Sequence, residues 1–295
     1  MSDFHPNLPR IFFSKVGNQQ LRTAIWSGAD KGEGKRTPLL FFNGIGANLE
    51  IAQTFADSFT GRDIITFDMP GVGGSPDPKF LYRPWWVASA ARKILKENGY
   101  DKVDVMGVSW GGGPAQQFTF QYQDMVRHLV LCCTTTGVTM VPGRAGALLK
   151  MVSPKRYMDK DFLTKNFETL YGDATSAVND FAINIVPPSV KGYIYQLGAM
   201  AGWSSLPFIR RIKVPTLILM GGNDHIVRPV NGRIMHALFR NSTYHEFDGA
   251  GHLFMLTRRE EFIHELREFF GEPEVPLPEY EPVQLPSVAA SYAHF

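Results

Sequence analysis

The chain has 295 residues, of which 44% are hydrophobic, so it can form one large α/β domain with an insertion or two small domains. Its net charge is +2, and the charges are mixed with no basic stripe, which argues against nucleic-acid binding. The N-terminus lacks the pattern of a signal peptide, and no apolar run is long enough to span a membrane. We therefore expect a globular protein of the cytoplasm.

Short segments rich in Val, Ile, Leu and Phe alternate along the chain with segments of helical pattern. Most of the apolar segments show little polar alternation, which is typical of strands buried on both faces. We expect strands at residues 10–16, 20–27, 37–43, 62–68, 102–108, 127–134, 215–221 and 242–247. We expect helices at residues 47–59, 84–98, 110–123, 227–239 and 257–270. This order predicts an α/β fold with a mostly parallel central sheet flanked by helices.

One segment interrupts the alternation, because about 75 residues separate two predicted strands where a crossover needs far fewer. Helical patterns at 160–171 and 176–185 and many large apolar residues indicate an inserted helical cap, and two ordinary crossover helices are the alternative. We expect the core at 1–136 and 214–271, the cap at 137–213, and a Pro-rich tail at 272–295.

The two cysteines, Cys132 and Cys133, are adjacent in a predicted strand. Neighbouring residues of a strand point to opposite faces, so a disulfide between them is not expected. We interpret them as two small buried residues of a reducing compartment.

A strand predicted at 102–108 runs directly into Gly107-Val108-Ser109-Trp110-Gly111. This G-x-S-x-G pattern between a strand and a helix is typical of a nucleophile elbow, in which the serine stands at the tip of a sharp turn. Side chains at Gly107 or Gly111 would crowd the neighbouring strand and helix. The pattern predicts that Ser109 is a nucleophile.

A serine nucleophile needs a base and an acid that orients the base, and in this topology they follow in the order Ser, Asp or Glu, His. Asp224 follows a predicted strand, and His252 lies in a small-residue loop after the last one. Because open α/β sheets place their sites past strand ends, we expect Ser109, Asp224 and His252 to meet.

Each catalytic role has a rival nearby in the sequence. His225 is adjacent to Asp224, His245 lies inside a predicted strand, and Asp248 precedes His252 in the same loop. We expect His245 to be structural, and we expect Asp248 to accept backbone hydrogen bonds.

An oxyanion also needs backbone donors. One is expected to be the N–H of Trp110, the residue after the nucleophile. The other is expected in the glycine-flanked loop after the third strand, at the N–H of Ile45 with Gly44 as the alternative. We expect four further residues to contact substrate: Asn43, Met140, Trp203 and Phe254.

The glycine cluster at 68–75 has neither the G-K-[ST] ending of a phosphate loop nor the G-x-G-x-x-G spacing of a dinucleotide site. No group of His, Cys and carboxylates has convincing metal-ligand spacing. We therefore expect neither a cofactor nor a metal.

At these motifs the chain resembles the α/β-hydrolase superfamily, and within it the intracellular medium-chain-length polyhydroxyalkanoate depolymerases. The matching segments are LLFFNGIGANLE (39–50), FDMPGVGGS (67–75), VMGVSWGGGPAQQF (105–118), MVPG (140–143), SPKRY (153–157), GGNDHIVRPVN (221–231) and GHLFMLTR (251–258). The resemblance implies a serine esterase that cuts storage polyesters of 3-hydroxy fatty acids, with Ser109 as nucleophile, Asp224 as acid and His252 as base.

The expected partner is thus a hydrophobic polyester, with the enzyme at the surface of storage granules; the sequence does not indicate an oligomeric state. Two alternatives remain open, since a fold and a nucleophile do not set the substrate. One is a capped hydrolase for small esters, lactones or carbon–carbon bonds. The other is a granule-binding protein without catalysis.

Overall fold

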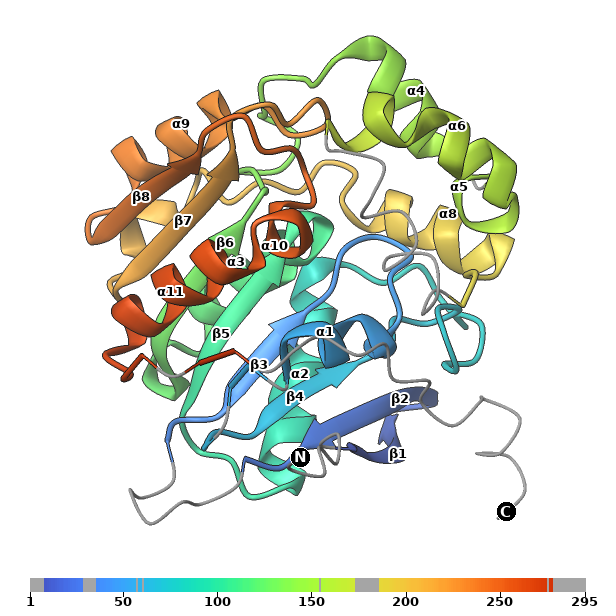
Figure 1. Cartoon of the computed structure of the whole chain (residues 1–295). Coiled ribbons are helices and arrows are strands. Elements are labelled where there is room, and N and C mark those ends of the chain that lie inside the picture. Colours follow the sequence, from blue (N-terminus) through green and yellow to red (C-terminus); the bar gives the residue numbers. More distant parts are fainter. Residues whose placement is uncertain are drawn as a thin grey trace, which may run out of the picture.

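The computed structural model describes residues 8–28, 36–56, 58–59, 61–153, 155–172, 186–274 and 276–277. Eight strands form one sheet in the order β1-β2-β4-β3-β5-β6-β7-β8 (Figure 1). Pairs β1–β2 and β2–β4 are antiparallel, and all other neighbours are parallel, which confirms the predicted sheet. The strands are β1 (Arg10–Val16), β2 (Gln19–Trp26), β3 (Leu39–Phe42), β4 (Ile64–Phe67), β5 (Val103–Val108), β6 (Val126–Cys132), β7 (Thr216–Gly221) and β8 (Ser242–Phe247).

Strands β3, β4, β5 and β7 are buried at every position because helices cover both faces of the sheet. In β3, Leu40 and Phe42 belong to one apolar core, whereas Leu39 and Phe41 belong to the core on the opposite face. This division follows from the period of two in a strand. It explains why the sequence shows continuous apolar runs rather than alternation.

Helices α2, α3 and α9 pack on one face, and α1, α10 and α11 pack on the other (Figure 1). Their bounds are α1 (Gln53–Ala56), α2 (Pro84–Glu97), α3 (Gly112–Gln121), α9 (Val230–Leu238), α10 (Phe254–Thr257) and α11 (Arg259–Phe270), with 3-10 turns η1 (Leu49–Ala52), η2 (Ser109–Gly111) and η3 (Gln123–Met125).

The predicted helices differ from the structure at their ends, and two of these differences lie beside the candidate site. The helix expected at 47–59 is a 3-10 turn followed by the single turn α1, because Asn48 and Glu50 at its start belong to a buried polar network. The helix expected at 257–270 is α11, which begins at Arg259. Arg258 separates it from α10 and has a non-helical backbone (φ −125°, ψ 42°). Both changes shorten elements at loops that border the candidate site.

The segment between β6 and β7 contains α4 (Ala145–Val152), α5 (Lys155–Met158), α6 (Lys160–Tyr171), α8 (Val190–Ala199) and the 3-10 turn η4 (Ile209–Arg211). In Figure 1, α4, α5, α6 and α8 lie together at the upper right, apart from the helices on the two faces of the sheet. The helix predicted at 160–171 is confirmed as α6, whereas the one predicted at 176–185 lies outside the described residues.

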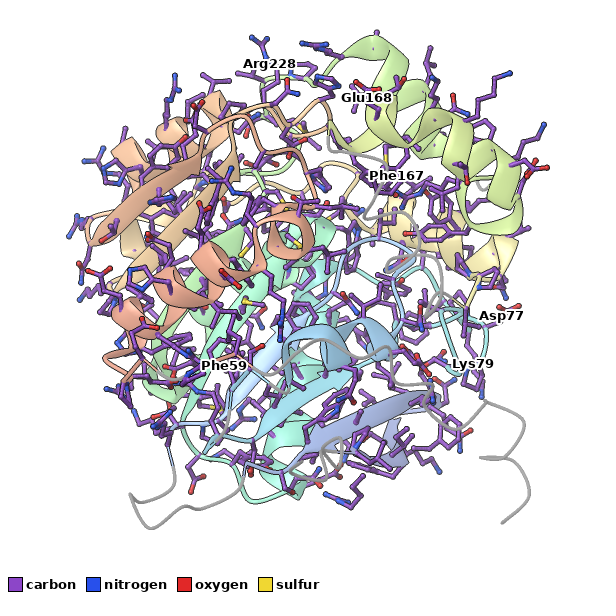
Figure 2. The ribbon with its side chains drawn as sticks, in the orientation of Figure 1. Phe59, Asp77, Lys79, Phe167, Glu168 and Arg228 are labelled. Carbon is purple, nitrogen blue, oxygen red and sulfur yellow. The ribbon has the colours of Figure 1, made fainter. Side chains whose placement is uncertain are left out.

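Helix α6 has clear local signals at both ends. The Asp159 carboxylate accepts a hydrogen bond from the N–H of Phe162, and Gly172 ends the helix in the left-handed conformation (φ 74°). Phe167 is fully buried while the next residue, Glu168, is exposed (Figure 2). The helix therefore turns one apolar side toward the protein.

At the start of the tail, Glu272 pairs with Arg62 and Arg36. Most of the predicted tail lies outside the described residues. Among the described helices, none combines the length and the hydropathy that a membrane-spanning segment requires.

Candidate active site

Ser109 stands at the turn between β5 and α3, where the sequence predicts a nucleophile elbow. Its φ is +53°, in the left-handed region that residues with a side chain rarely adopt. Such strain persists only where the surrounding structure holds it in place. The carbonyl oxygen of Ser109 accepts a hydrogen bond from Thr134 Oγ1 at 2.7 Å, which ties the turn to the end of β6.

The glycines of the motif are needed because the turn is crowded. A Cβ at Gly111 would lie 2.1 Å from the carbonyl oxygen of Phe42, and a Cβ at Gly107 would lie 2.6 Å from the Cβ of Ala115. Real Cβ atoms do not approach so closely, which confirms the predicted crowding. The elbow therefore packs directly on the end of β3.

Asp224 and His252 form a buried hydrogen-bonded pair past the ends of β7 and β8. His252 Nδ1 lies 2.6 Å from Asp224 Oδ2, and both residues are less than 5% exposed. The other carboxylate oxygen, Oδ1, accepts the N–H groups of Ile226 and Val227 at 2.8 and 2.9 Å. The backbone of its own loop thus holds one carboxylate oxygen of Asp224, which leaves the other oxygen facing the imidazole.

The pair sets the charge of the imidazole. Burial lowers the pKa of His252, but the neighbouring Asp224 carboxylate and Cys133 outweigh it and hold the pKa well above 6.5. Burial raises the pKa of the Cys133 thiol, so the thiol is uncharged near neutral pH and Asp224 supplies the charge. The imidazole of His252 therefore loses its positive charge, and can act as a base, only at a pH well above 6.5.

Cys133 belongs to this buried group, which its sequence context did not indicate. It has a φ of +41°, and one ligand atom from each of Cys133, Asp224 and His252 lies within 4.8 Å of the others. These atom types suit a transition metal. However, Asp224 Oδ2 and His252 Nδ1 are hydrogen-bonded directly to each other, so the geometry fits an acid–base pair better than a metal centre.

The rival residues lie elsewhere. His245 is paired with Glu265 at 3.2 Å, and His225 contacts the side chain of Asn223. Asp248 is exposed, whereas the His252 ring nitrogen is bound by Asp224. In the structure, therefore, Asp224 is the acid that binds His252. Asp248, His225 and His245 do not take part in this pair.

Ser109 and His252 line one cavity that is largely apolar. Its other lining residues are Phe41, Asn43, Gly44, Ile45, Ala47, Ile51, Met106, Val108, Met151, Arg156, Tyr157, Tyr171, Leu253, Met255, Leu256 and Phe262. Ser109 also borders a second cavity, together with Trp110, Thr134, Thr135, Gly137, Val138, Met140, Met200 and Val227. The nucleophile candidate thus stands between two hollows.

The residues expected to contact substrate divide into two groups. Asn43 lines the first cavity and Met140 lines the second. Trp203 is buried, lines neither cavity, and donates its indole N–H to Gln117 Oε1 at 2.8 Å. Phe254 is fully buried and stacks on Phe247 with ring centroids 4.5 Å apart.

The loop expected to supply an oxyanion donor lies beside the elbow. A Cβ at Gly44 would be 3.8 Å from the Cβ of Ser109. The N–H of Ala47 donates to the carbonyl oxygen of Gly44 at 3.2 Å, which closes a four-residue turn with Ile45 and Gly46 in its middle. This places the backbone of Gly44 and Ile45 next to the nucleophile candidate.

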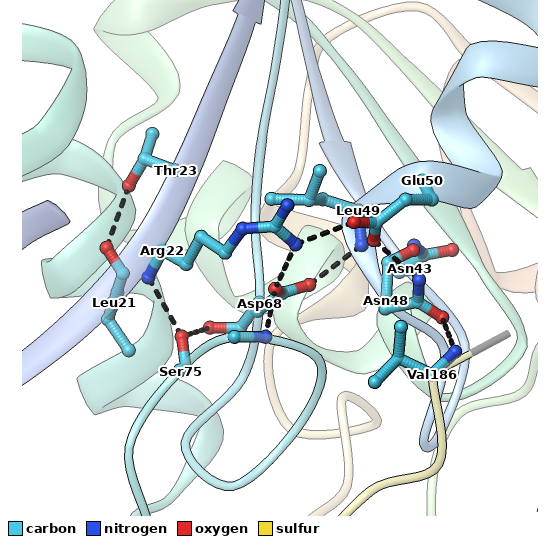
Figure 3. A network of polar contacts seen from close by, with 11 residues as sticks. Leu21, Arg22, Thr23, Asn43, Asn48, Leu49, Glu50, Asp68, Ser75 and Val186 are labelled. Atoms are coloured by element: carbon cyan, nitrogen blue, oxygen red, sulfur yellow. Dashed lines mark hydrogen bonds and ion pairs between the residues drawn. The ribbon is translucent and has the colours of Figure 1, made fainter. Parts of the chain in front are cut away.

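A buried polar network adjoins this loop (Figure 3). Arg22 Nη1 lies 2.7 Å from Glu50 Oε1 and 3.4 Å from Asp68 Oδ2, and the Arg22 side chain is fully buried. Asp68 accepts the N–H of Leu49 at 2.7 Å and that of Gly74 at 3.0 Å. The glycine cluster at 68–75 thus has a structural role. It belongs to a network in which the guanidinium group of Arg22 pairs with the carboxylates of Glu50 and Asp68.

The network continues into the segment between β6 and β7 (Figure 3). Asn48 donates to Glu50, and its Oδ1 accepts the N–H of Val186 at 3.2 Å. Asn43 Nδ2 donates to the carbonyl oxygen of Asn48 at 2.7 Å. These bonds fix both ends of the loop that contains Gly44 and Ile45.

Substitution of Asp68 by asparagine tests the protonation of this network. Burial, helped by the charge of Glu50 and opposed by Arg22, raises the pKa of Asp68 from 3.8 to about 7. Between these values the folded state holds a proton that the unfolded chain releases, so rising pH removes stability. The melting temperature of the wild type, compared with Asp68→Asn, is therefore expected to fall steadily between about pH 4 and about pH 7 and to level off above that.

The exposed carboxylate of Asp101 offers a matched control, since its hydrogen bond to Lys96 and the charge of Lys96 lower its pKa. For Asp101→Asn the difference in melting temperature should stay constant over the same range of pH. A constant difference for Asp68→Asn as well would contradict the raised pKa.

Three contacts of the candidate site were not predicted from the sequence. Tyr171 accepts the N–H of His252 on its carbonyl oxygen at 2.5 Å and stacks on the imidazole with centroids 6.3 Å apart. Arg156 and Gln196 contact the loop at Ile45 and Gly46. All three come from the segment between β6 and β7, and no local pattern reveals such contacts because they depend on how that segment packs.

Comparison with known proteins agrees with this geometry. A model of the α/β-hydrolase fold family matches residues 37–258. The chain is 38% identical over 258 residues to the poly(3-hydroxyalkanoate) depolymerase of Ectopseudomonas oleovorans, and the alignment covers 85% of this chain and 89% of that protein.

Solved structures show the same fold. An esterase from Exiguobacterium antarcticum superposes with a TM-score of 0.72 at 21% identity, covering 86% of this chain and 96% of its own. The enol-lactonase from Burkholderia xenovorans LB400 gives a TM-score of 0.69 at 19% identity, covering 88% and 100%. At these identities the likeness concerns the fold alone. The family match over most of the chain and the similarity to the depolymerase together show that this chain is a hydrolase of the α/β-hydrolase family.

Proposed function

We propose that this hydrolase is a serine esterase that cleaves ester bonds of poly(3-hydroxyalkanoate) through an acyl-enzyme. The observation that carries the proposal is the cavity that Ser109 and His252 share, with His252 held by Asp224 at 2.6 Å. The 38% identity to a poly(3-hydroxyalkanoate) depolymerase supports the choice of substrate.

In the first step Ser109 Oγ attacks the ester carbonyl carbon while His252 takes the hydroxyl proton. The carbonyl oxygen becomes an oxyanion, which the N–H groups of Trp110 and Ile45 receive, with Gly44 as the alternative donor. The ester C–O bond then breaks as His252 gives its proton to the leaving hydroxyl oxygen. Asp224 keeps the imidazole in the required tautomer and stabilises its positive charge.

In the second step water attacks the acyl-enzyme and gives a proton to His252. The bond from the acyl carbon to Ser109 Oγ breaks, and the proton returns to the serine. The products are the free acid and the regenerated enzyme. Because His252 must be neutral to begin each step, its raised pKa makes this chemistry favourable at alkaline rather than acidic pH.

The walls of the cavity suit an uncharged substrate with alkyl side chains. Met106 and Phe262, which are nearly fully buried, also line the cavity, so it reaches from Ser109 toward the core beneath α11. Each CH₂ group that enters such a space gains about 0.8 kcal/mol from burial. We infer that an alkyl side chain of the polyester occupies this space.

We also propose that residues 137–213 form a cap over the cavity. Met151, Arg156, Tyr157 and Tyr171 from this segment line it together with residues of the sheet loops. In this proposal the enzyme works in the cytoplasm at the surface of polyester granules, where a chain of the polymer enters between the cap and the core.

The test is release of 3-hydroxyalkanoic acids from amorphous medium-chain polyester granules, with Ser109→Ala as the blank. We expect release by the wild type alone. If the wild type leaves the granules intact but cleaves short p-nitrophenyl esters, the substrate is a small soluble ester instead. If neither substrate is cleaved and a fluorophosphonate probe does not label the protein, the chain is not a serine esterase.

A further inference from the structure

One residue of α8 contacts both of the segments that are expected to bind the oxyanion. Gln196 is fully buried, and its Oε1 accepts the N–H of Gly46 at 2.8 Å. Its backbone carbonyl oxygen accepts the indole N–H of Trp110 at 2.9 Å. Gly46 follows the donor candidate Ile45, and Trp110 is the second candidate. A single residue thus joins the two sides of the expected oxyanion hole.

The bond to Gly46 acts on a defined turn. The turn from Gly44 to Ala47 is closed by a hydrogen bond, and Gly46 has a φ of +69°. Ile45 is not among the described residues with positive φ, so this is a type II turn. Type I and type II turns differ by a flip of the middle peptide, which here joins the Ile45 carbonyl to the Gly46 N–H. Whatever holds that peptide decides the turn type.

Side chains from the segment between β6 and β7 hold this peptide at both ends. Gln196 accepts the N–H of Gly46 at one end. At the other end the carbonyl oxygen of Ile45 accepts hydrogen bonds from Arg156 Nη2 at 2.9 Å and from the hydroxyl of Tyr157. The Tyr157 ring also fills the space beside Gly46, where a Cβ would lie 2.5 Å from Cε2. A flipped peptide would lose all three hydrogen bonds within a buried site, where unmet polar groups are costly.

The same cluster reaches the base. Arg156 is 3% exposed, and its Nη1 donates to the hydroxyl of Tyr171 at 3.3 Å. Tyr171 in turn accepts the backbone N–H of His252. In the described part of the chain, Arg156 forms no ion pair with a carboxylate within 4.0 Å. Its contacts are instead the Ile45 carbonyl, the sulfur of Met151 and tyrosine groups, so its main role is to hold backbone and side chains in place.

We propose that Gln196 is a positioning residue that sets the geometry of the oxyanion hole, with Arg156 and Tyr157 holding the opposite end of the same peptide. The inference rests on the proposed serine esterase function. Gln196 lies outside the residues that line the described cavity with Ser109, so it acts on the substrate through the Ile45–Gly46 peptide and through Trp110. It therefore stabilises the transition state rather than the bound ester.

The variant Gln196→Met tests this role, because methionine has a similar length and cannot accept the Gly46 hydrogen bond. With that bond lost, we expect kcat to fall about 10- to 100-fold while KM changes less than about 3-fold. Binding of an alkyl trifluoromethyl ketone, whose adduct with Ser109 carries the oxyanion, should weaken by the same factor as kcat. The readouts are initial rates on a p-nitrophenyl alkanoate and the inhibition constant.

Gln117 provides a matched control on α3. It is also buried, and its Oε1 also accepts a hydrogen bond, from Trp203 Nε1 at 2.8 Å, but it has no contact with the loop at Gly46. Gln117→Met should lower the melting temperature by an amount similar to Gln196→Met and leave kcat close to that of the wild type. An equal loss of kcat in both variants would mean that Gln196 is merely structural, and would overturn the inference.

If Gln196→Met does not fold, Trp110→Phe removes the bond to the Gln196 carbonyl and keeps the backbone N–H of residue 110. We expect a lower kcat with a similar KM; an unchanged kcat in a folded variant of either kind overturns the inference. Failure of the proposed function gives a different result, since activity would then survive in Ser109→Ala. Loss of activity in Ser109→Ala, with kcat unaffected by the Gln196 change, rejects only the role of Gln196.

Discussion

Replacement of Ser109 by alanine is expected to lower kcat/KM for ester hydrolysis by about 10⁴- to 10⁶-fold. The variant keeps the cavity, the Asp224–His252 pair and the proposed oxyanion donors, but it has no atom that can form the proposed acyl-enzyme. The residual rate should come from electrostatic stabilisation and binding alone. The measurement is the initial rate on a p-nitrophenyl alkanoate with a chain long enough to fill the apolar cavity.

A buried serine that lines neither of the two cavities beside Ser109 offers the control. Ser205 is fully buried, and its hydroxyl has no hydrogen-bond partner in the described part of the chain. Ser205→Ala should therefore keep both activity and stability. If Ser109→Ala retained more than about a tenth of the wild-type rate, Ser109 could not be the nucleophile.

The second large effect is expected for Asp224→Asn, with a loss of about 10⁴-fold in kcat. Asp224 Oδ1 accepts two backbone N–H groups, so the oxygen of an asparagine will occupy that position. Its NH₂ group must then face His252 Nδ1, which forces the proton of a neutral imidazole to the nitrogen that should act as the base. The variant is therefore expected to fold, but with the proton of His252 on Nε2, so that this nitrogen cannot accept the proton of Ser109.

The pH profile gives this prediction a second readout. In the wild type the Asp224 carboxylate holds the pKa of His252 above its ordinary value, so the acidic limb of kcat/KM lies above pH 6.5. Removing the charge of Asp224 lowers that pKa, and the residual activity of Asp224→Asn should have its acidic limb at lower pH. The exposed Asp248, in the same loop as His252, is the control: Asp248→Asn should keep the wild-type rate and profile.

The sequence predicted all eight strands. Four of the central ones, β3, β4, β5 and β7, are short, largely apolar runs that are buried at every position, which makes them easy to recognise. The sequence also predicted where Ser109, Asp224 and His252 lie, because each follows a strand and parallel strands end at one edge of the sheet. The extents of the helices after β3 and near Arg258 were less predictable, since the first begins in a buried polar network that includes Arg22 and the second is interrupted by the non-helical backbone of Arg258.

The contacts of Gln196, Arg156, Tyr157 and Tyr171 could not be predicted at all. Each joins residues 80 or more positions apart, such as Gly46 with Gln196, or lies on an irregular segment whose packing has no periodic signal. Cys133 was interpreted correctly as buried, but neither its positive φ nor its closeness to Asp224 and His252 is indicated by the residue type. The positions of the proposed catalytic residues could thus be predicted from local sequence patterns, whereas the residues that contact and hold them could not.

The hydrogen bonds from Arg156, Tyr157 and Gln196 to a single peptide have a consequence for engineering this protein. The segment between β6 and β7 forms part of the cavity wall and also holds the backbone beside Ser109. Grafting that segment from a relative to change which substrate fits would therefore also replace the supports of the turn at Gly46. A graft that is meant to change substrate specificity without lowering turnover should therefore keep Arg156, Tyr157 and Gln196 at the same spacing.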